Sequence, residues 1–294
     1  MEASVVRLNN TGAESGGPPA TGVEAPSGKD RADENFPVGS MLISPKYRPY
    51  VHAFYGFARN ADDIADAGDL PEAEKITRLN AMEDILLGRR TSGSPTSTLL
   101  RARLAERQLT NEHARDLLHA FRQDATKSRY SSWPELMEYC RYSAMPVDRF
   151  MLDLHGESRD TWPHSDALCS ALQVLNHLQD CALDLEILDR CYLPADLLAE
   201  HHADVQDLRR PAETAALRRV FNALLDKCDE LNRAAAPLPR RVRNMRLRME
   251  SAVICTLARR LAVRLRKGDP MATRVALQRG DYFRGLWAAT RAII

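Results

Sequence analysis

One stretch of the sequence, residues 167–188, constrains the fold more than any other. Leucine and alanine occupy almost every side of the helix that it would form, and such a helix is normally buried in the centre of a domain. Gln173, Asn176, Asp180 and Asp184 nevertheless recur at offsets of 0, 3, 7 and 11, which places them in one line along the helix. Because a buried carboxylate without a partner is costly, we expect a cation to face this line.

A matching polar line runs along residues 48–66. Its members recur at offsets of 0, 4, 7 and 11 beside an apolar stripe: Tyr55, Arg59, Asp62 and Asp66. The carboxylates of Asp62 and Asp66 repel each other, because residues four apart are neighbours on a helix. Nothing in an isolated helix compensates for this repulsion, so the pair indicates a functional role.

Each pair of aspartates also has a simpler interpretation. Asp62 and Asp66 could be solvated, and Asp180 and Asp184 could pair with some of the many arginines. Two aspartates four residues apart form a short pattern that often occurs by chance. Since two such pairs occur, each on an apolar helix with amide, arginine or tyrosine neighbours, we favour one joint site.

The residue types predict a magnesium site. Carboxylate oxygens without His or Cys suit Mg²⁺, which keeps several waters and binds one or two carboxylates together with phosphate oxygens of a substrate. We therefore expect two opposed carboxylate pairs to hold Mg²⁺ ions on a diphosphate: Asp62, Asp66, Asp180 and Asp184. Departure of the diphosphate would leave a carbocation in a water-poor cavity, where aromatic faces stabilise it.

The chain as a whole predicts one all-α domain, residues 35–294, behind a disordered tail, residues 1–34. The tail is rich in Gly, Pro, Ser and charged residues and cannot bury enough apolar surface to offset its ordering entropy. Beyond it, apolar residues recur at spacings of three to four, and Pro or Gly separates the helical stretches.

Composition argues against several classes of protein. The 41 Lys and Arg against 40 Asp and Glu leave a net charge of +1, which argues against a dedicated nucleic-acid binder. No apolar run approaches the roughly 18 residues needed to span a bilayer, and no basic-then-apolar export signal is present. The six cysteines are scattered, so we expect reduced thiols in a cytoplasmic protein.

The two polar lines resemble the signature motifs of the squalene/phytoene synthase family. The first motif runs from Tyr55 to Asp66, and the second runs from Gln173 to Asp184 and is followed by Tyr-Leu-Pro at 192–194. The resemblance covers residues 34–194 and is weaker beyond. It implies a single helical bundle of the isoprenoid-synthase type with a central cavity.

Three further segments are similar to the bacterial hydroxysqualene synthases of the hopanoid route: residues 34–38, 121–130 and 139–147. This resemblance implies conversion of presqualene diphosphate to hydroxysqualene, in which diphosphate leaves, the cation rearranges and water captures it. It also implies two pathway partners, a presqualene diphosphate synthase and a flavin-dependent hydroxysqualene reductase. The alternatives are a head-to-head prenyl transferase acting on farnesyl diphosphate and a non-catalytic, squalene-synthase-like assembly factor.

The resemblance assigns roles to polar residues beside the metal ligands. Asp63 would support the ligands, and Gln173 and Asn176 would orient their face of the site. Arg59 would bind the diphosphate as a forked cation. The alternative for Arg59 is a structural ion pair with Asp63.

The resemblance also places three aromatic residues at the substrate. Phe36 and Tyr55 would contact the prenyl chain or its head, and Tyr139 would lie near the reacting carbon. The alternative for each is plain packing in the core.

Four positions depart from the pattern of the resembled family. Met145 replaces an Asn, Asp148 replaces a Gly that lets a helix break beside the substrate, Gln179 replaces an Arg of many relatives, and Asp189 replaces a turn-forming Gly. These changes bear on the product more than on the fold or on metal use.

Two groups of charged residues allow more than one interpretation. The first is a basic run that is either a solvated face or a docking surface for anionic lipid at the inner face of the membrane: Arg240, Arg241, Arg243, Arg246, Arg248, Arg259, Arg260, Arg264, Arg266 and Lys267. The second is either an ion-pair network or a lid over the diphosphate: Arg122, Asp124, Lys127 and Arg129. We expect His177 in the core and His201 and His202 at the surface.

Overall fold

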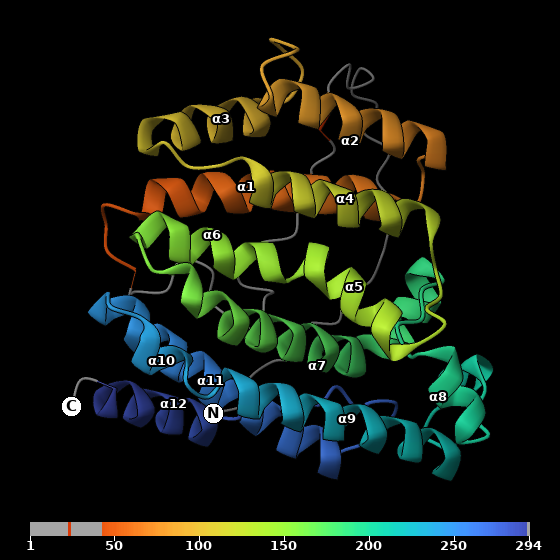
Figure 1. The fold of residues 1–294 in the computed structure, drawn as a ribbon. Helices are drawn as coiled ribbons and strands as arrows, with labels where there is room; N and C mark the ends of the chain where they lie inside the picture. The colour runs from red at the N-terminus through yellow and green to blue at the C-terminus, as the bar shows by residue number, and fades with distance from the viewer. Residues whose placement is uncertain (1–22, 25–42, 293–294) are drawn as a thin grey trace, which may run out of the picture.

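The computed structural model describes residues 23–24 and 43–292, and every regular element in this part of the chain is a helix (Figure 1). The α-helices are α1 (Arg48–Asp66), α2 (Glu72–Leu86), α3 (Pro95–Arg107), α4 (Glu112–Thr126), α5 (Trp133–Ser143), α6 (Met145–His155), α7 (Trp162–Leu188), α8 (Ala195–Glu200), α9 (Ala215–Ala235), α10 (Leu238–Arg241), α11 (Met245–Lys267) and α12 (Arg279–Arg291). Two short 3₁₀ turns are η2 (Arg159–Thr161) and η3 (Val205–Arg209). The predicted all-α fold class is confirmed.

The two helices that carry the polar lines have local causes for their bounds. Helix α1 spans the predicted residues 48–66. Helix α7 begins at Trp162, five residues earlier than predicted. Pro163 fits in its first turn because the backbone N–H groups there have no hydrogen-bond partner within the helix, so the absence of one costs nothing. It ends before Asp189, whose φ of 49° puts this residue in the left-handed region that favours glycine. The carboxylate of Asp189 forms an ion pair with Arg129 at 2.8 Å across this turn.

The helices form layers around two groups of buried apolar side chains. In Figure 1, α2 and α3 lie outermost at one end, followed by α1 with α4, then α5 with α6, then α7, with α9, α11 and α12 at the other end. One core joins α1, α2, α3 and α4 with Phe150 and Leu154 of α6. The other core is built on α5, α7, α8, α9 and α11. Helices α4, α5 and α6 pack on one another and link the two cores.

Two residues of the expected tail fall within the described part of the chain. Val23 is buried in the first core, and the side chain of Glu24 accepts hydrogen bonds from the Ser94 hydroxyl at 2.7 Å and the Thr96 amide at 2.7 Å. The rest of residues 1–34, together with Phe36, lies outside the described residues.

The cysteines and the helices bear on two further predictions. All six cysteines are free thiols, as expected, and five of them are buried. Among the described helices, none has both the length and the apolar character that crossing a bilayer requires.

Candidate active site

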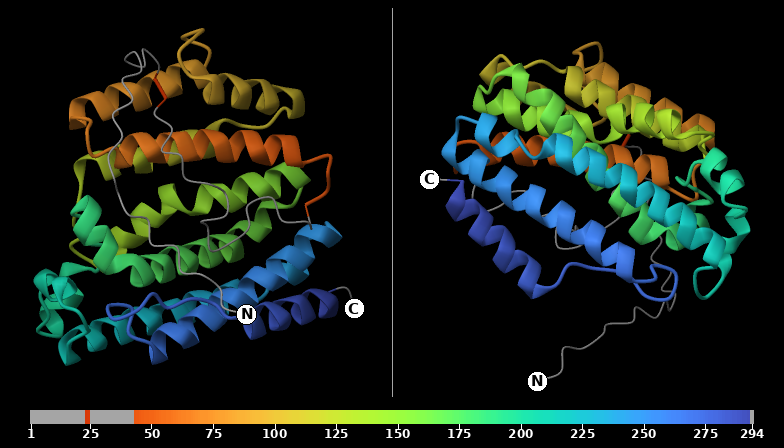
Figure 2. Two further views of the ribbon diagram at one scale, coloured as in Figure 1. Left: turned by 180° about the vertical axis from the view of Figure 1, so that it is seen from behind. Right: turned by 60° about the horizontal axis from the view of Figure 1, so that its bottom comes forward.

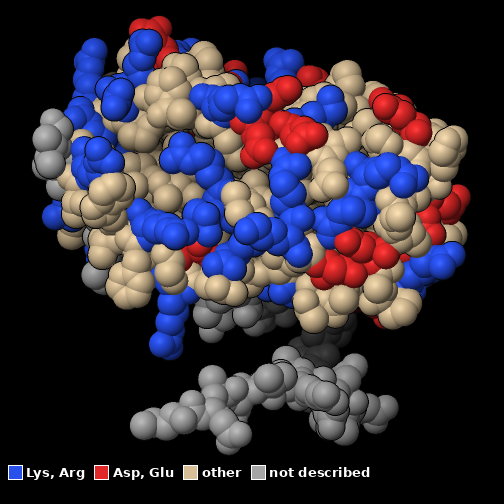
Figure 3. Space-filling view, turned by 90° about the horizontal axis from the view of Figure 1, so that it is seen from below, with Lys and Arg blue, Asp and Glu red and all other residues tan. Residues whose placement is uncertain are grey.

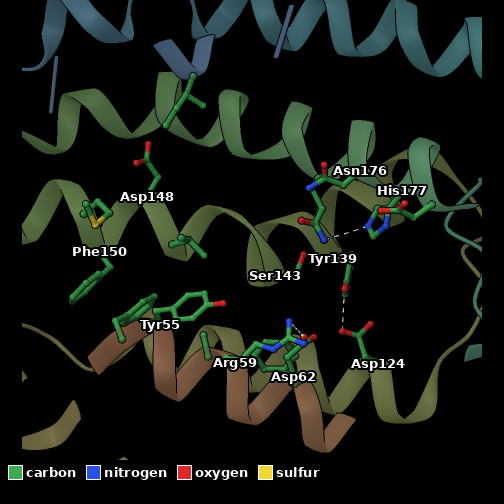
Figure 4. Close-up of a pocket in the computed structure, with 18 of the residues that line it drawn as sticks. Tyr55, Arg59, Asp62, Asp124, Tyr139, Ser143, Asp148, Phe150, Asn176 and His177 are labelled. Atoms are coloured by element: carbon green, nitrogen blue, oxygen red, sulfur yellow. Dashed lines mark hydrogen bonds and ion pairs between the residues drawn. The ribbon is translucent and has the colours of Figure 1, made fainter. Parts of the chain in front are cut away.

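A cavity of about 620 Å³ lies between α1 and α7. Helices α4, α5, α6 and α11 complete its wall, and Figure 4 shows side chains from both sides pointing into it. Nine of the predicted site residues line this cavity: Tyr55, Arg59, Asp62, Asp66, Tyr139, Gln173, Asn176, Asp180 and Asp184. The two polar lines, more than 100 residues apart in the sequence, therefore face one space.

The polar line on α1 is organised by Arg59. Its guanidinium lies 3.3 Å from an Asp62 oxygen and 3.2 Å from an Asp63 oxygen. Asp63 does not line the cavity, and its carboxylate forms an ion pair with Arg59 outside the cavity wall. Arg59 therefore forms the structural pair of the simpler interpretation and also lines the cavity.

Burial and the crowding of carboxylates raise the pKa of Asp62. Its side chain lines the cavity, and burial, followed by the charge of the adjacent Asp66, raises its pKa to about 7. Asp66 is held by Arg190, whose Nη1 lies 2.6 Å from its Oδ1. Arg190 follows α7 in sequence, so this ion pair ties the end of α7 to the end of α1.

The polar line on α7 has an arginine and a histidine as partners. Asp180 pairs with Arg274 at 3.1 Å, and Asp184 lies 3.9 Å from Nδ1 of His177. The Gln173 amide and the His177 ring are 3.3 Å apart, so His177 belongs to the same polar surface. The simpler interpretation, in which Asp180 and Asp184 pair with arginines, therefore holds for Asp180. Asp66, which it expects to be solvated, is instead paired with Arg190, and both carboxylates line the cavity.

A buried group of tyrosines closes the cavity between the two lines. The Tyr139 hydroxyl donates to Asp124 at 3.0 Å, and the Tyr192 hydroxyl lies 3.5 Å from the other Asp124 oxygen. Burial raises the pKa of Asp124 to about 7, against the opposing effect of Arg190. The Tyr192 ring stacks on His177 with ring centres 3.5 Å apart. Tyr139 therefore has a polar partner in addition to its apolar packing.

Five residues of this surface are not among the predicted site residues: Asp124, His177, Arg190, Tyr192 and Arg274. The three cations that neighbour Asp124 in the sequence form ion pairs outside the cavity wall: Arg122 with Glu83, Lys127 with Glu135 and Arg129 with Asp189. The interpretation as an ion-pair network therefore applies to these three. Asp124 differs because it faces inward.

The other end of the cavity is apolar. Phe54 and Phe150 stack with ring centres 4.1 Å apart, and further aliphatic side chains complete this wall: Ile43, Val51, Met151, Leu247 and Ile254. Such a surface excludes water from a reactive carbocation and offers it aromatic faces.

Asp148 places a carboxyl group in this apolar part. It lines the cavity and accepts a hydrogen bond from the Ser165 hydroxyl, and burial raises its pKa above the usual range. Ser143 also lines the cavity, drawn beside Tyr139 in Figure 4, and its hydroxyl oxygen is buried with no hydrogen-bond partner in the described part of the chain. Met145 is not part of the cavity wall, and its sulfur lies 4.0 Å from Arg149 Nη2.

The donor set suits magnesium ions that bring other ligands with them. Within the described residues, no three His, Cys, Asp or Glu side chains are close enough to hold a metal ion by themselves. Each line offers two carboxylates, which matches Mg²⁺, an ion that retains waters and takes its remaining ligands from phosphate oxygens. Burial and the charge of Asp66 raise the pKa of Asp62 although Arg59 lies beside it, so a further cation at this wall would favour the ionised form of that carboxyl group.

Comparisons with known proteins agree with this geometry. The family model described as "Squalene/phytoene synthase" matches residues 29–281. A hydroxysqualene synthase from Rhodopseudomonas palustris is 47% identical over 255 residues, which are 87% of this chain and 87% of the relative. A hydroxysqualene synthase from Zymomonas mobilis is 44% identical, covering 85% of this chain and 84% of the relative.

A solved structure shares both the fold and part of the sequence. The squalene synthase HpnC from Alicyclobacillus acidocaldarius superposes with a TM-score of 0.71 at 30% identity, covering 81% of this chain and 90% of that one. The predicted family and branch are confirmed by these matches. The chain belongs to the squalene/phytoene synthase family of enzymes, on the branch of the hydroxysqualene synthases.

Proposed function

We propose that this enzyme converts presqualene diphosphate and water to hydroxysqualene and diphosphate, with Mg²⁺ as its cofactor. One observation carries the proposal: relatives named hydroxysqualene synthase are 43–47% identical over most of the chain. The cavity supports it, because one end carries carboxylates and arginines and the other end is apolar. A prenyl diphosphate has the same division into an anionic head and an apolar chain.

The polar lines would bind the head of the substrate. Asp62, Asp66, Asp180 and Asp184 would hold Mg²⁺, which neutralises the diphosphate and makes it a better leaving group. Three arginines line the polar end of the cavity and can donate hydrogen bonds to phosphate oxygens: Arg59, Arg190 and Arg274. The last two are not predicted from the sequence. Gln173 and Asn176 would orient the head by hydrogen bonds.

The apolar wall would hold the chain and the cation that ionisation leaves. Tyr55, Phe54 and Phe150 present rings to the cavity, and Tyr139 stands between the two ends. Aromatic faces stabilise a carbocation while they exclude bulk water. Phe36, for which the family resemblance implies a place at the prenyl chain, stays a prediction.

Capture by water needs a polar position inside the apolar end. The Ser143 hydroxyl has an unused hydrogen-bonding capacity in the described part of the chain, and the Asp148 carboxyl lies on the same wall. We propose that these two groups hold the water that attacks the final cation, with the released proton passing to the Asp148 carboxylate. The carbon–oxygen bond forms as the water loses that proton.

The product would then leave for a second enzyme. A synthase must supply the C30 diphosphate, and a flavin-dependent reductase would remove the hydroxyl group of hydroxysqualene. Because substrate and product are very apolar, we place the protein in the cytoplasm with peripheral contact to the inner face of the membrane.

A second candidate is squalene itself, since the structural relative at 30% identity is named squalene synthase. Incubation of purified protein with presqualene diphosphate and Mg²⁺ in ¹⁸O-labelled water, with and without NADPH, separates the two. We expect one C30 alcohol that carries ¹⁸O in both reactions. Squalene formed only with NADPH, or a C30 diphosphate made from farnesyl diphosphate as the sole activity, would overturn the proposal.

A further inference from the structure

Helix α12 exposes a row of large apolar side chains on the outside of the molecule. Tyr282, Phe283, Leu286 and Trp287 are 47%, 71%, 60% and 62% exposed. They recur at positions i, i+1, i+4 and i+5, so they share one side of the helix. We call these four residues the aromatic ridge. Figure 2 (right) shows α12 at the edge of the bundle, beside α11.

The opposite side of α12 is packed closely on α11. Gly285 lies so near that a Cβ atom there would be 3.1 Å from Val253 Cγ1. Asp281 is 1% exposed and accepts hydrogen bonds from Arg260 at 2.8 Å and from Arg264. Its second role is to cap the helix, since it also accepts from the Gln278 amide at 2.9 Å. The ridge is therefore displayed by a helix that is anchored on its other face.

The surroundings of the ridge are strongly cationic. Between residues 238 and 292 the sequence has fourteen Arg and Lys but only three acids, which are Glu250, Asp269 and Asp281. Figure 3 looks at this end of the bundle, where Lys and Arg spread widely over the surface. On α12 itself the one acid is buried, and the three arginines form no ion pair with a residue in 43–292: Arg279, Arg284 and Arg291.

Not every arginine of the basic run is free to meet a ligand. Arg260 and Arg264 hold Asp281, and Arg266 pairs with Asp226 at 2.9 Å and with Asp229 at 2.7 Å. These three therefore serve the fold. This moves the expected lipid contact from the run at 240–267 toward α12.

We propose that the aromatic ridge of α12 docks into the interfacial layer of an anionic lipid bilayer, with the arginines of α12 on lipid headgroups. A helix with Trp, Phe and Leu on one side and arginines beside them is typical of segments that lie in the membrane plane. Helix α12 has 13 residues, about 20 Å of helix, and is too short to cross a bilayer core of about 30 Å. Anionic lipid suits the unpaired arginines better than a neutral apolar partner does.

This docking does not depend on the reaction, although it would bring an apolar substrate and product to the enzyme that the proposed function describes. The vesicle-binding assay therefore tests the docking proposal, and the turnover assay separately tests the proposed function. Protein that binds vesicles but makes no hydroxysqualene contradicts the proposed function alone.

Sedimentation with vesicles tests the ridge. The full chain is mixed with vesicles of phosphatidylglycerol and phosphatidylcholine, or of phosphatidylcholine alone, at low and high salt. We expect binding to the anionic vesicles, about tenfold weaker for the double variant Phe283→Ser/Trp287→Ser. The Arg279→Gln/Arg284→Gln variant should lose mainly the preference for anionic lipid. Leu99→Ser, an exposed leucine on α3, should bind like the original protein.

Two results would overturn the proposal. One is an unchanged affinity of the Phe283→Ser/Trp287→Ser protein for anionic vesicles, with circular dichroism showing both proteins folded. The other is a ridge variant that changes only the sedimentation coefficient without lipid, which would assign the ridge to a second copy of this chain. High salt should leave part of the protein bound, because apolar insertion is not screened.

Discussion

Arg190 and Asp66 form an ion pair of 2.6 Å at one end of the cavity, and the same guanidinium donates to two backbone carbonyl groups. The acceptors are the Ala65 oxygen at 3.2 Å and the Asp124 oxygen at 2.9 Å. One side chain therefore joins α1, α4 and the turn after α7. A single cation thus steadies a carboxylate of the site and the backbone that carries it.

We expect Arg190→Gln to lower both stability and turnover. The change leaves the buried Asp124 carbonyl group without its arginine donor, which costs about 1–3 kcal/mol in the free energy of unfolding, whereas the Ala65 oxygen keeps Lys75 Nζ at 2.9 Å. Urea unfolding without Mg²⁺ measures this loss. Arg129→Gln, on an exposed arginine of the neighbouring turn, is the control and should change the free energy by less than about 1 kcal/mol. Equal losses in the two variants would contradict the assignment.

Asp62→Ala and Asp180→Ala should each abolish turnover and leave the fold intact. Removal of Asp62 relieves repulsion with Asp66, so this variant should be at least as stable as the original protein without Mg²⁺. Thermal unfolding and product analysis at saturating Mg²⁺ check both statements. Asp69→Ala, in the exposed loop after α1, should keep full turnover. Full activity in either site variant would rule out a role of its carboxylate in binding the diphosphate.

Asp148→Asn should stabilise the protein at high pH. The pKa of Asp148 is raised by folding, so the folded state holds its proton more tightly than the unfolded state does. The stability that this proton contributes is full below the unfolded pKa and is lost as the pH rises through the folded pKa. Replacement by the neutral amide removes that loss. Free energies of unfolding at pH 5 and pH 8 should therefore show the larger gain at pH 8, whereas a gain independent of pH would contradict burial of the charge.

Ser143→Ala should change the product while preserving the fold. If the Ser143 hydroxyl holds the attacking water, its loss should lower the fraction of alcohol and raise the fraction of hydrocarbons formed by proton loss. Total diphosphate release, measured as phosphate after pyrophosphatase, should fall less than the alcohol does. Cys140→Ser, on the same helix but buried in the core, is a control for nonspecific disturbance. An unchanged ratio of alcohol to hydrocarbon would remove Ser143 from the mechanism.

Asp281→Asn should loosen α12 from α11. The carboxylate is held by Arg260 and Arg264, which keep its pKa well below the usual range despite burial, and breaking a buried pair costs about 3–5 kcal/mol. We expect faster amide hydrogen exchange along α12. Asp226→Asn, at an exposed ion pair on α9, should cost less than about 1 kcal/mol and leave exchange unchanged. Slow exchange in the Asp281 variant would show that apolar packing alone holds the helix.

The parts of the fold and of the site that depend on helical periodicity could be predicted from the sequence. The bounds of α1, the end of α7 and eight of the nine cavity residues follow from offsets along two helices, because side chains three or four apart share a face. The ninth, Tyr139 on α5, follows from the family resemblance alone. Arg190 and Arg274 could not be found this way, since both lie outside the helices and reach the site through tertiary packing. Asp124 is on a helix, but the residues around it pair elsewhere, and only the fold shows which of them turns inward.

The exposed ridge marks another limit of sequence analysis. An amphipathic pattern shows that a helix has two faces and does not show what covers the apolar one. On α12 the face that packs inward is made of small residues and one buried aspartate, while the large side chains remain outside. The usual expectation, large apolar residues in the core, is reversed there.

The two polar lines belong to helices of different cores, which are linked by α4, α5 and α6 and by the ion pair between Asp66 and Arg190. The width of the cavity thus depends on the packing of the linking helices as well as on the two polar lines. A substitution between α4 and α6 can spread or narrow the gap while every ligand keeps its identity. In such a bundle, substitutions in the linking helices can therefore change the length of substrate that fits, whereas substitutions of the aspartates change the chemistry.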